Sequence, residues 1–332
     1  MPEVSLRTQI KLYKKRAAEI EAYLLNNPHE WGKFQSEFNA EVNAVFYNIM
    51  NFEKENLAAG REDRVYKLKR LFIKKFRDTF AKGDYVLWSL RKPFGYAGDF
   101  KIIEDLYLNR PVTTGFDRLF DNYTQMSAIA VAVRNRKDDF KGFISDFANN
   151  SKNQKIRIMD LASGPCRDVK EMLSSGILSS KDVTFDCYDS DDRAIEYAKG
   201  SLAEFSNINF FNRNAIRLAL SKNISSMIDK KYDIIYSTGL FDYFDEKIST
   251  RLVANLAKLL NNKGVLIIAS VRDKFSNPSV YFMEWAAEWN LVYRSDEEFQ
   301  RVFINAGFRE DQIQIKYEQQ GILQYIIASN NA

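Results

Sequence analysis

The sequence predicts an α/β protein, with a doubly wound, mostly parallel sheet that follows an all-α N-terminal region. Three observations support this fold class. Residues 1–90 repeat apolar side chains at helical spacing, residues from 155 onward alternate short β-branched runs with helical stretches, and two strand-like runs follow each other near the end of the chain. Because 332 residues exceed one typical domain, we expect a helical domain over residues 1–125 and a second domain over residues 126–332.

The helical region is identified by apolar residues three or four positions apart, as in the series Ile10, Tyr13, Ala17, Ile20 and Leu24. Residues 61–77 of this region are rich in Lys and Arg. Such a stretch can be a nucleic-acid or membrane-surface face, or the solvated face of an amphipathic helix. The whole chain has 48 basic and 44 acidic residues, so its charge is nearly balanced. We therefore expect a solvated helix face and no nucleic-acid partner.

Five strands are expected in the second region, with helical stretches between them, at residues 155–160, 182–189, 207–211, 232–237 and 263–271. Residues 312–317 alternate polar and apolar side chains, and residues 322–328 form another β-rich run after Gly321. Two successive strands with a short link predict an antiparallel hairpin at the end of an otherwise parallel sheet.

Composition excludes several classes of site. The two cysteines, Cys166 and Cys187, cannot build a disulfide scaffold or a four-thiolate zinc site, and the single histidine, His29, cannot supply a two-histidine site. We expect no metal site, and proton transfer would fall to Asp, Glu, Tyr, Lys or water. No apolar run reaches 18 residues and the first residues lack a signal-peptide core. We expect a cytoplasmic protein without stable membrane insertion.

The segment Asp160-Leu161-Ala162-Ser163-Gly164-Pro165-Cys166 ends the first expected strand and leads into a helix. It joins an acid to a turn of small residues, which lets a ligand approach the backbone at the carboxyl end of a strand. It matches neither the triphosphate-binding loop nor Gly-x-Gly-x-x-Gly. A tight strand-to-helix turn without a ligand is the alternative.

The second expected strand also ends in an acid, Asp189, followed by Ser190, Asp191 and Asp192. An acid in this position suits hydrogen bonds to ribose hydroxyls. Asp191 or Asp192 is expected to cap the following helix. A small-residue turn and an acid on neighbouring strands together predict a nucleotide-type ligand.

These segments resemble the class I S-adenosylmethionine-dependent methyltransferases over roughly residues 125–332. The resemblance implies a Rossmann-like, seven-stranded sheet with an antiparallel C-terminal strand, and S-adenosyl-L-methionine as cofactor. Ala162 and Cys166 stand where that family often has glycine, which tightens the turn. Asn212–Ala215 resembles the adenine-contacting turn. The cofactor-binding residues that the resemblance implies are Asp160, Ala162, Ser163, Gly164, Asp189, Ser190, Asn214, Ala215, Ser237 and Gly239.

Two further segments bear on the methyl acceptor. Residues 233–244 lack the Asp/Asn-Pro-Pro-aromatic motif of DNA amino-methyltransferases, so base amino groups are not expected as acceptors. The loop Gly95–Asp99 is equally a functional element or a helix–helix turn in which Asp99 caps residues 100–108. Gly-Tyr-Ala-Gly-Asp there and Gly-Leu-Phe-Asp-Tyr at 239–243 together resemble bacterial 3-hydroxy-fatty-acid (3-hydroxypalmitate) methyl ester synthases.

That subgroup implies methyl transfer to the carboxylate of an acyl chain. An ionised carboxylate needs no base, but it does need a cation or hydrogen-bond donors. Arg272 is the candidate cation, with an ion pair to Asp273 or Asp242 as the alternative. A hydroxyl acceptor would instead need a base, for which Asp99 and Asp242 are candidates. The candidate catalytic residues are Tyr96, Asp99, Asp242, Tyr243 and Arg272.

Other functions stay open at this point. They are O- or N-methylation of a hydroxylated or amine metabolite, RNA methylation through residues 61–77, and cofactor sensing without catalysis. The helical region is expected to be a substrate lid or a homodimer interface. Trp285 and Trp289 lie four residues apart and are expected on one helix face. They would either line an apolar tunnel or pack in a core, and we favour packing.

Overall fold

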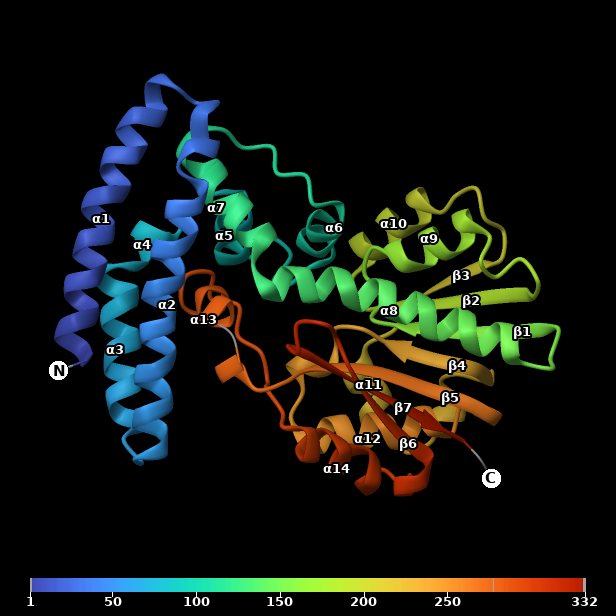
Figure 1. The fold of residues 1–332 in the computed structure, drawn as a ribbon. Helices are drawn as coiled ribbons and strands as arrows, with labels where there is room; N and C mark the ends of the chain where they lie inside the picture. Colours follow the sequence, from blue (N-terminus) through green and yellow to red (C-terminus); the bar gives the residue numbers. More distant parts are fainter. Residues whose placement is uncertain (1, 277, 331–332) are drawn as a thin grey trace. The chain divides into compact units, whose positions relative to one another are not determined.

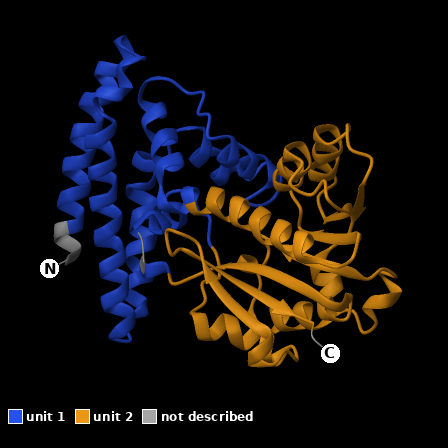
Figure 2. Ribbon diagram, turned by 45° about the vertical axis from the view of Figure 1, so that its right-hand side comes forward, with its two compact units in different colours: residues 1–131, 274–290 blue, residues 132–273, 291–332 orange. Residues whose placement is uncertain are grey.

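The computed structural model describes residues 2–276 and 278–330. Its chain forms two compact units, which are described separately (Figure 2). Unit 1 comprises residues 1–131 and 274–290, and unit 2 comprises residues 132–273 and 291–332. The domain boundary placed at 125/126 from the sequence stays a prediction. The compact units change at 131/132, and residues 274–290 belong to the helical unit.

Unit 1 is helical, as the apolar spacing predicts. Its helices are α1 (Pro2–Asn26), η1 (Glu30–Lys33), α2 (Gln35–Ala58), α3 (Glu62–Lys75), α4 (Arg77–Phe80), α5 (Asp84–Arg91), α6 (Phe100–Leu108) and α7 (Gly115–Met126), followed much later in the chain by η4 (Lys274–Ser276) and α13 (Pro278–Trp285). His29 is the N-cap residue of the short helix η1.

The core of unit 1 is built largely from aromatic rings. Phe46 on α2 is fully buried and packs edge-on against Phe72, Phe80 and Phe282, with centroid distances of 5.9, 5.2 and 5.4 Å. Trp285 on α13 packs against Phe72 at 5.5 Å. The segment after the fifth strand therefore completes the helical core, which agrees with the packing role favoured for Trp285.

Trp289 does not continue the same helix face. Helix α13 ends at Trp285, and Glu288 adopts a left-handed backbone with φ of 52°. The expectation of two tryptophans on one helix face is therefore wrong, because the chain turns between them. Lys274 pairs with Glu53 and Arg77 pairs with Glu288, so ion pairs as well as apolar packing hold this segment in unit 1.

Three of the basic residues of α3 have partners within unit 1. Lys67 pairs with Asp63 at 2.8 Å, and Arg64 lies over the Phe52 ring at 5.8 Å. Lys69 donates to Asn290 at 3.2 Å and lies over Trp285. These contacts are those of an amphipathic helix whose charged face also packs against neighbouring segments.

Unit 2 contains a seven-stranded sheet in the order β3-β2-β1-β4-β5-β7-β6. Its strands are β1 (Lys155–Leu161), β2 (Asp182–Asp189), β3 (Ile208–Asn212), β4 (Tyr232–Ser237), β5 (Leu260–Val271), β6 (Ile313–Tyr317) and β7 (Leu323–Ser329). The pairs among β1 to β5 are parallel, whereas β7 runs antiparallel to both β5 and β6. The predicted fold class and terminal hairpin are confirmed.

Helices cover both faces of this sheet (Figure 1). One face is covered by α8 (Ala128–Asn150), α9 (Arg167–Ser175) and α10 (Asp192–Ser201), and the other by α11 (Ala215–Leu220), α12 (Glu246–Ala257) and α14 (Asp296–Asn305). Short 3-10 helices lie at Ile224–Ser226, Phe241–Tyr243 and Glu310–Gln312. Alternate strand residues point to opposite faces, so Met159 and Leu161 join the apolar core beneath α11, α12 and α14, while Asp160 points to the other face. No helix among the described residues is long and apolar enough to cross a membrane.

Candidate functional site

The turn after β1 is held against the end of β2 by its own backbone. Ser163 N–H donates to the carbonyl of Tyr188 at 3.1 Å, and Cys166 N–H closes the turn on Ser163 at 3.0 Å. Ala162 and Gly164 adopt left-handed backbones, with φ of 57° and 53°. This conformation suits glycine and costs an alanine about 1–2 kcal/mol. A glycine at the position of Ala162 would therefore be less strained than the alanine.

Asp189 ends β2 beside this turn. Its Oδ2 accepts from Gly164 N–H at 2.9 Å, and its Oδ1 accepts from Asp191 N–H at 2.9 Å. Burial raises the pKa of the Asp189 carboxyl, and the two N–H donors oppose that shift. Asp191 caps α10 through Arg193 N–H. Of the two acids expected as caps, Asp191 is the N-cap residue, and Asp192 is the first residue of the helix.

Asn214 and Ala215 follow β3, whose last residue pairs with Asp189 at the end of β2. The Asn214 side chain caps α11 by accepting from Ile216 N–H at 2.9 Å and Arg217 N–H at 3.2 Å, and Ala215 is the first residue of that helix. A surface cavity of about 480 Å³ beside this turn is lined in part by Ser190, Asn214 and Met227. Of the turn expected around an adenine, Asn212, Arg213 and Asn214 line this cavity, whereas Ala215 does not.

Asp160 is the most buried acid of the turn region, with 2% of its surface exposed. Its Oδ2 has no hydrogen-bond partner among the described residues. Burial raises the pKa of the Asp160 carboxyl, and the nearby acids Asp168 and Cys166 raise it further. Tyr236 O–H donates to Asp168 at 2.8 Å, which satisfies that second acid.

The end of β4 carries Ser237 and Gly239. Ser237 Oγ donates to the Leu161 carbonyl at 2.7 Å, which ties β4 to the turn after β1. Gly239 lies under Arg136 of α8: a Cβ placed on this glycine would stand 3.4 Å from the Nη1 atom of the guanidinium. A Cβ here would be in ordinary van der Waals contact with the guanidinium of Arg136, which is itself 5% exposed.

Asp242 and Arg294 form a buried polar cluster beyond Gly239. Asp242 accepts from Val271 N–H at 2.8 Å, and Arg294 donates to the Phe241 carbonyl at 2.9 Å. Burial raises the pKa of the Asp242 carboxyl, and the charges of Arg136 and Arg294 oppose that shift. Asp242 therefore joins the ends of β4 and β5, and it lies near two buried cations.

Arg272 and Tyr243 differ from this cluster in exposure. Arg272 forms a two-point ion pair with Asp296, at 2.9 and 3.1 Å, and lies over the Tyr317 ring at 4.5 Å. Its partner is neither of the acids considered from the sequence, Asp273 and Asp242, but one that begins α14. Tyr243 is 41% exposed.

The two candidates in unit 1 are Tyr96 and Asp99. Asp99 is fully buried and caps α6 by accepting from Lys101 N–H at 3.0 Å and Ile102 N–H at 3.1 Å. It also accepts from Trp88 Nε1–H at 2.8 Å. These contacts are those of the helix-cap alternative. Tyr96 is 38% exposed.

Sequence reasoning missed Arg136 and Arg294 as residues of the site. Arg136 lies on a helix before β1, about a hundred residues from Gly239, and no local motif surrounds it. The one usable signal was Gly239 itself, because a glycine at a strand end can mark a close approach by another group. Arg294 follows the segment 274–290, in which the sequence predicts a helix that continues to Trp289, beyond its observed end at Trp285.

Comparisons with known proteins concern the fold. No family model matches the chain, and no curated protein matches it in sequence. A solved structure from Bordetella parapertussis, described as a possible exported protein, has 16% identity and a TM-score of 0.60, covering 80% of this chain and 96% of its own. A candidate methyltransferase from Thermobifida fusca has 15% identity and a TM-score of 0.51, covering 69% and 94%. The chain shares its fold with these two structures over the parts that they cover.

Proposed function

We propose that the protein transfers a methyl group from S-adenosyl-L-methionine to a small molecule. The observation that carries this proposal is the geometry at the carboxyl ends of β1, β2 and β3. A left-handed small-residue turn, the buried Asp189 and the cavity beside Asn214 lie along one edge of the sheet. In doubly wound sheets this edge is where nucleotide-like ligands bind. The candidate methyltransferase from Thermobifida fusca shares the fold, which supports the reaction class.

The residues present fit such a cofactor. Asp189 is positioned for ribose hydroxyls, and the backbone of Ala162, Ser163 and Gly164 offers close approach. The Asp160 carboxyl, with one oxygen that lacks a partner among the described residues, lies near the end of β1, just before this backbone. The cofactor, when bound, would supply a methyl carbon that bonds to an acceptor oxygen as its bond to sulfur breaks and the thioether leaves. The protein's part is to align the two and exclude water.

We assign a carboxylate of a fatty acid, such as a 3-hydroxy acid, as the preferred acceptor, and a methyl ester as the product. Both candidate bases are already engaged: Asp99 accepts three hydrogen bonds, and Asp242 accepts from Val271 and lies near two cations. A carboxylate acceptor needs no base. Arg272 forms an ion pair with Asp296. We propose Arg136, which lies beside Gly239, as the cation that binds the acceptor. The cytoplasmic location and a homodimer stay predictions from the sequence.

The test of the cofactor assignment is Asp189→Ala. Loss of the carboxylate should weaken S-adenosylmethionine binding by about 1–3 kcal/mol, or roughly 5- to 150-fold, as expected for lost hydrogen bonds to a charged group. Isothermal titration calorimetry measures the affinity. Asp182→Ala is the matched control, because it makes the same change at the exposed opposite end of β2. Equal affinities in two folded variants would refute the assignment.

The test of the acceptor uses methyl-labelled S-adenosylmethionine with a 3-hydroxy fatty acid and with a bacterial lipid extract. Label that enters the organic phase and is released by mild alkali is expected, since a methyl ester is base-labile. Arg136→Gln should raise KM for the acid more than Arg272→Gln does. Label confined to polar products, in protein that binds the cofactor, would favour a hydroxylated or amine metabolite instead.

A further inference from the structure

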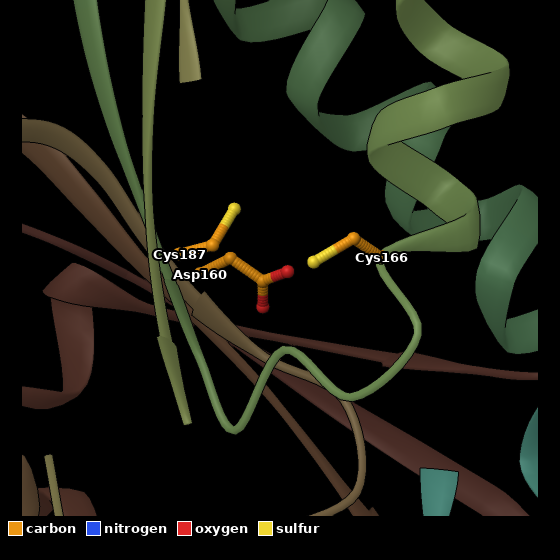
Figure 3. A group of neighbouring side chains, drawn as sticks. All are labelled: Asp160, Cys166 and Cys187. Atoms are coloured by element: carbon orange, nitrogen blue, oxygen red, sulfur yellow. The ribbon is translucent and has the colours of Figure 1, made fainter. Parts of the chain in front are cut away.

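One face of the sheet carries a row of ionisable side chains. It is the face opposite the apolar core beneath α11, α12 and α14. In the register of the strands, Asp160 of β1 is the direct partner of Cys187 on β2 and of Tyr236 on β4. Partners in register point to the same face of a sheet. The turn after β1 then brings Cys166, the N-cap residue of α9, over this row. Figure 3 shows Asp160 and Cys187 projecting from neighbouring strands and Cys166 projecting toward them from the turn.

We propose that Asp160, Cys166 and Cys187 bind a thiophilic divalent metal ion such as Zn²⁺. Their carboxylate oxygen and two sulfur atoms all lie within 4.8 Å of one another. Three atoms so spaced fit within a sphere of about 2.8 Å radius, whereas Zn–S and Zn–O bonds are about 2.3 and 2.0–2.2 Å. A shift of roughly half an ångström per side chain would therefore close the site on the ion.

The surroundings of the three side chains support a cation. Both sulfur atoms belong to fully buried residues, and Asp160 is 2% exposed with Oδ2 unpartnered and buried. In the sheet register Asp160 lies between Cys187 and Tyr236, and Tyr236 O–H donates to Asp168 at 2.8 Å, so titratable groups surround the three side chains. A buried acidic cluster is stable either when its members keep their protons or when a cation binds.

Coordination replaces those protons. As the two sulfur–metal bonds form, both thiol protons leave to solvent, and no oxidant is consumed. The ion would join the end of β1, β2 and the first turn of α9 through one centre. The turn that carries Ala162 and Gly164 would then be fixed at both ends, so the site would pre-form the backbone against which the proposed cofactor binds.

The composition makes the test unusually clean. The chain has two cysteines and one histidine, so any thiolate–metal signal must come from Cys166 or Cys187. Full-length protein, reduced, kept under argon and stripped of metal by a chelator, is titrated with CoCl₂. One equivalent should produce a thiolate-to-cobalt charge-transfer band in the near ultraviolet, which ZnCl₂ then displaces. Cys187→Ser should weaken metal binding by about 100-fold or more, since even outer-shell partners are worth 10- to 100-fold. His29→Gln, the matched control, should keep the band.

Several results would overturn the proposal. One is the absence of a thiolate band in folded wild-type protein at excess CoCl₂. Another is a band of unchanged intensity in both Cys166→Ser and Cys187→Ser. A third is a loss of titratable thiols that dithiothreitol restores without metal binding, which would identify the pair as a disulfide couple instead. The wild-type titration requires no variant to fold, and its readout is independent of methyl transfer.

Discussion

Asp99 in the helical unit and Asp160 in the sheet unit are both buried acids, yet their surroundings differ. Asp99 accepts hydrogen bonds from two backbone N–H groups and from the Trp88 indole. Asp160 has an oxygen without a partner and is surrounded by other acids. A fully satisfied acid stabilises its own helix end, whereas an unsatisfied one at the carboxyl edge of a sheet is available to a ligand. Asp99 therefore has a structural role in unit 1, whereas the unpartnered oxygen of Asp160 in unit 2 is the one on which the proposed binding role depends.

The largest effect is expected from the aromatic core of unit 1. Phe46→Ala removes a fully buried ring that contacts three other aromatic residues, so the free energy of unfolding should fall by about 3–5 kcal/mol. Urea denaturation followed by circular dichroism measures the change. Tyr47→Ala, at a neighbouring position that is 52% exposed, should change stability far less. Equal losses in both variants would mean that the ring cluster does not stabilise unit 1.

A pH effect is expected from Asp121, also in unit 1. Burial raises the pKa of the Asp121 carboxyl to about 6. Because this pKa is higher in the folded than in the unfolded protein, the protonated carboxyl adds to the free energy of unfolding. This contribution is fully present below about pH 3.8 and is lost as pH rises through about 6. The shift corresponds to about 3 kcal/mol. Asp121→Asn should thus gain stability relative to wild type between pH 4 and 7, as measured by thermal unfolding at each pH. Parallel pH profiles for the two proteins would contradict this expectation.

A smaller loss, with a clear functional corollary, is expected from Asp99. Asp99→Ala leaves the α6 N-terminus uncapped and the Trp88 indole unpaired, and should destabilise by about 2–3 kcal/mol. Asp99→Asn keeps an oxygen for the two backbone donors and should lose less. If Asp99 is only structural, methyl transfer by folded Asp99→Asn stays within a few-fold of wild type. A loss of 100-fold or more would instead assign it as a general base.

The smallest effect is expected on the exposed face of α3. Lys67 and Asp63 form an ion pair in which both side chains are about two-thirds exposed. Solvent screens such a pair, so Lys67→Ala should leave the unfolding midpoint unchanged within error. The companion measurement is RNA binding at physiological salt, which should be weak and equal for the wild type and the variant. A steep salt dependence that the variant reduces would reopen the nucleic-acid alternative.

The sheet could be predicted because its signals are local. β-Branched runs gave β2 and β4 at their observed bounds, and gave the other strands within three residues. The acid at the end of β2 and the cap at Asp99 follow from strand and helix termini, which are also local. The membership of residues 274–290 in the helical unit was not predictable, because it depends on contacts of Phe282 and Trp285 with residues some 200 positions earlier. The Arg272–Asp296 pair and the approach of Arg136 to Gly239 depend on tertiary packing in the same way.

The excursion of the chain at 274–290 also limits how the protein can be divided. The polypeptide passes between the two units three times, after residues 131, 273 and 290. A fragment that ends at residue 131 would lack Phe282 and Trp285, and would expose the faces of Phe46 and Phe72 that those rings cover. The helical unit is therefore not a detachable N-terminal module. To join the helical unit to another sheet protein, residues 1–131 and residues 274–290 would have to be inserted at two separate places in that protein.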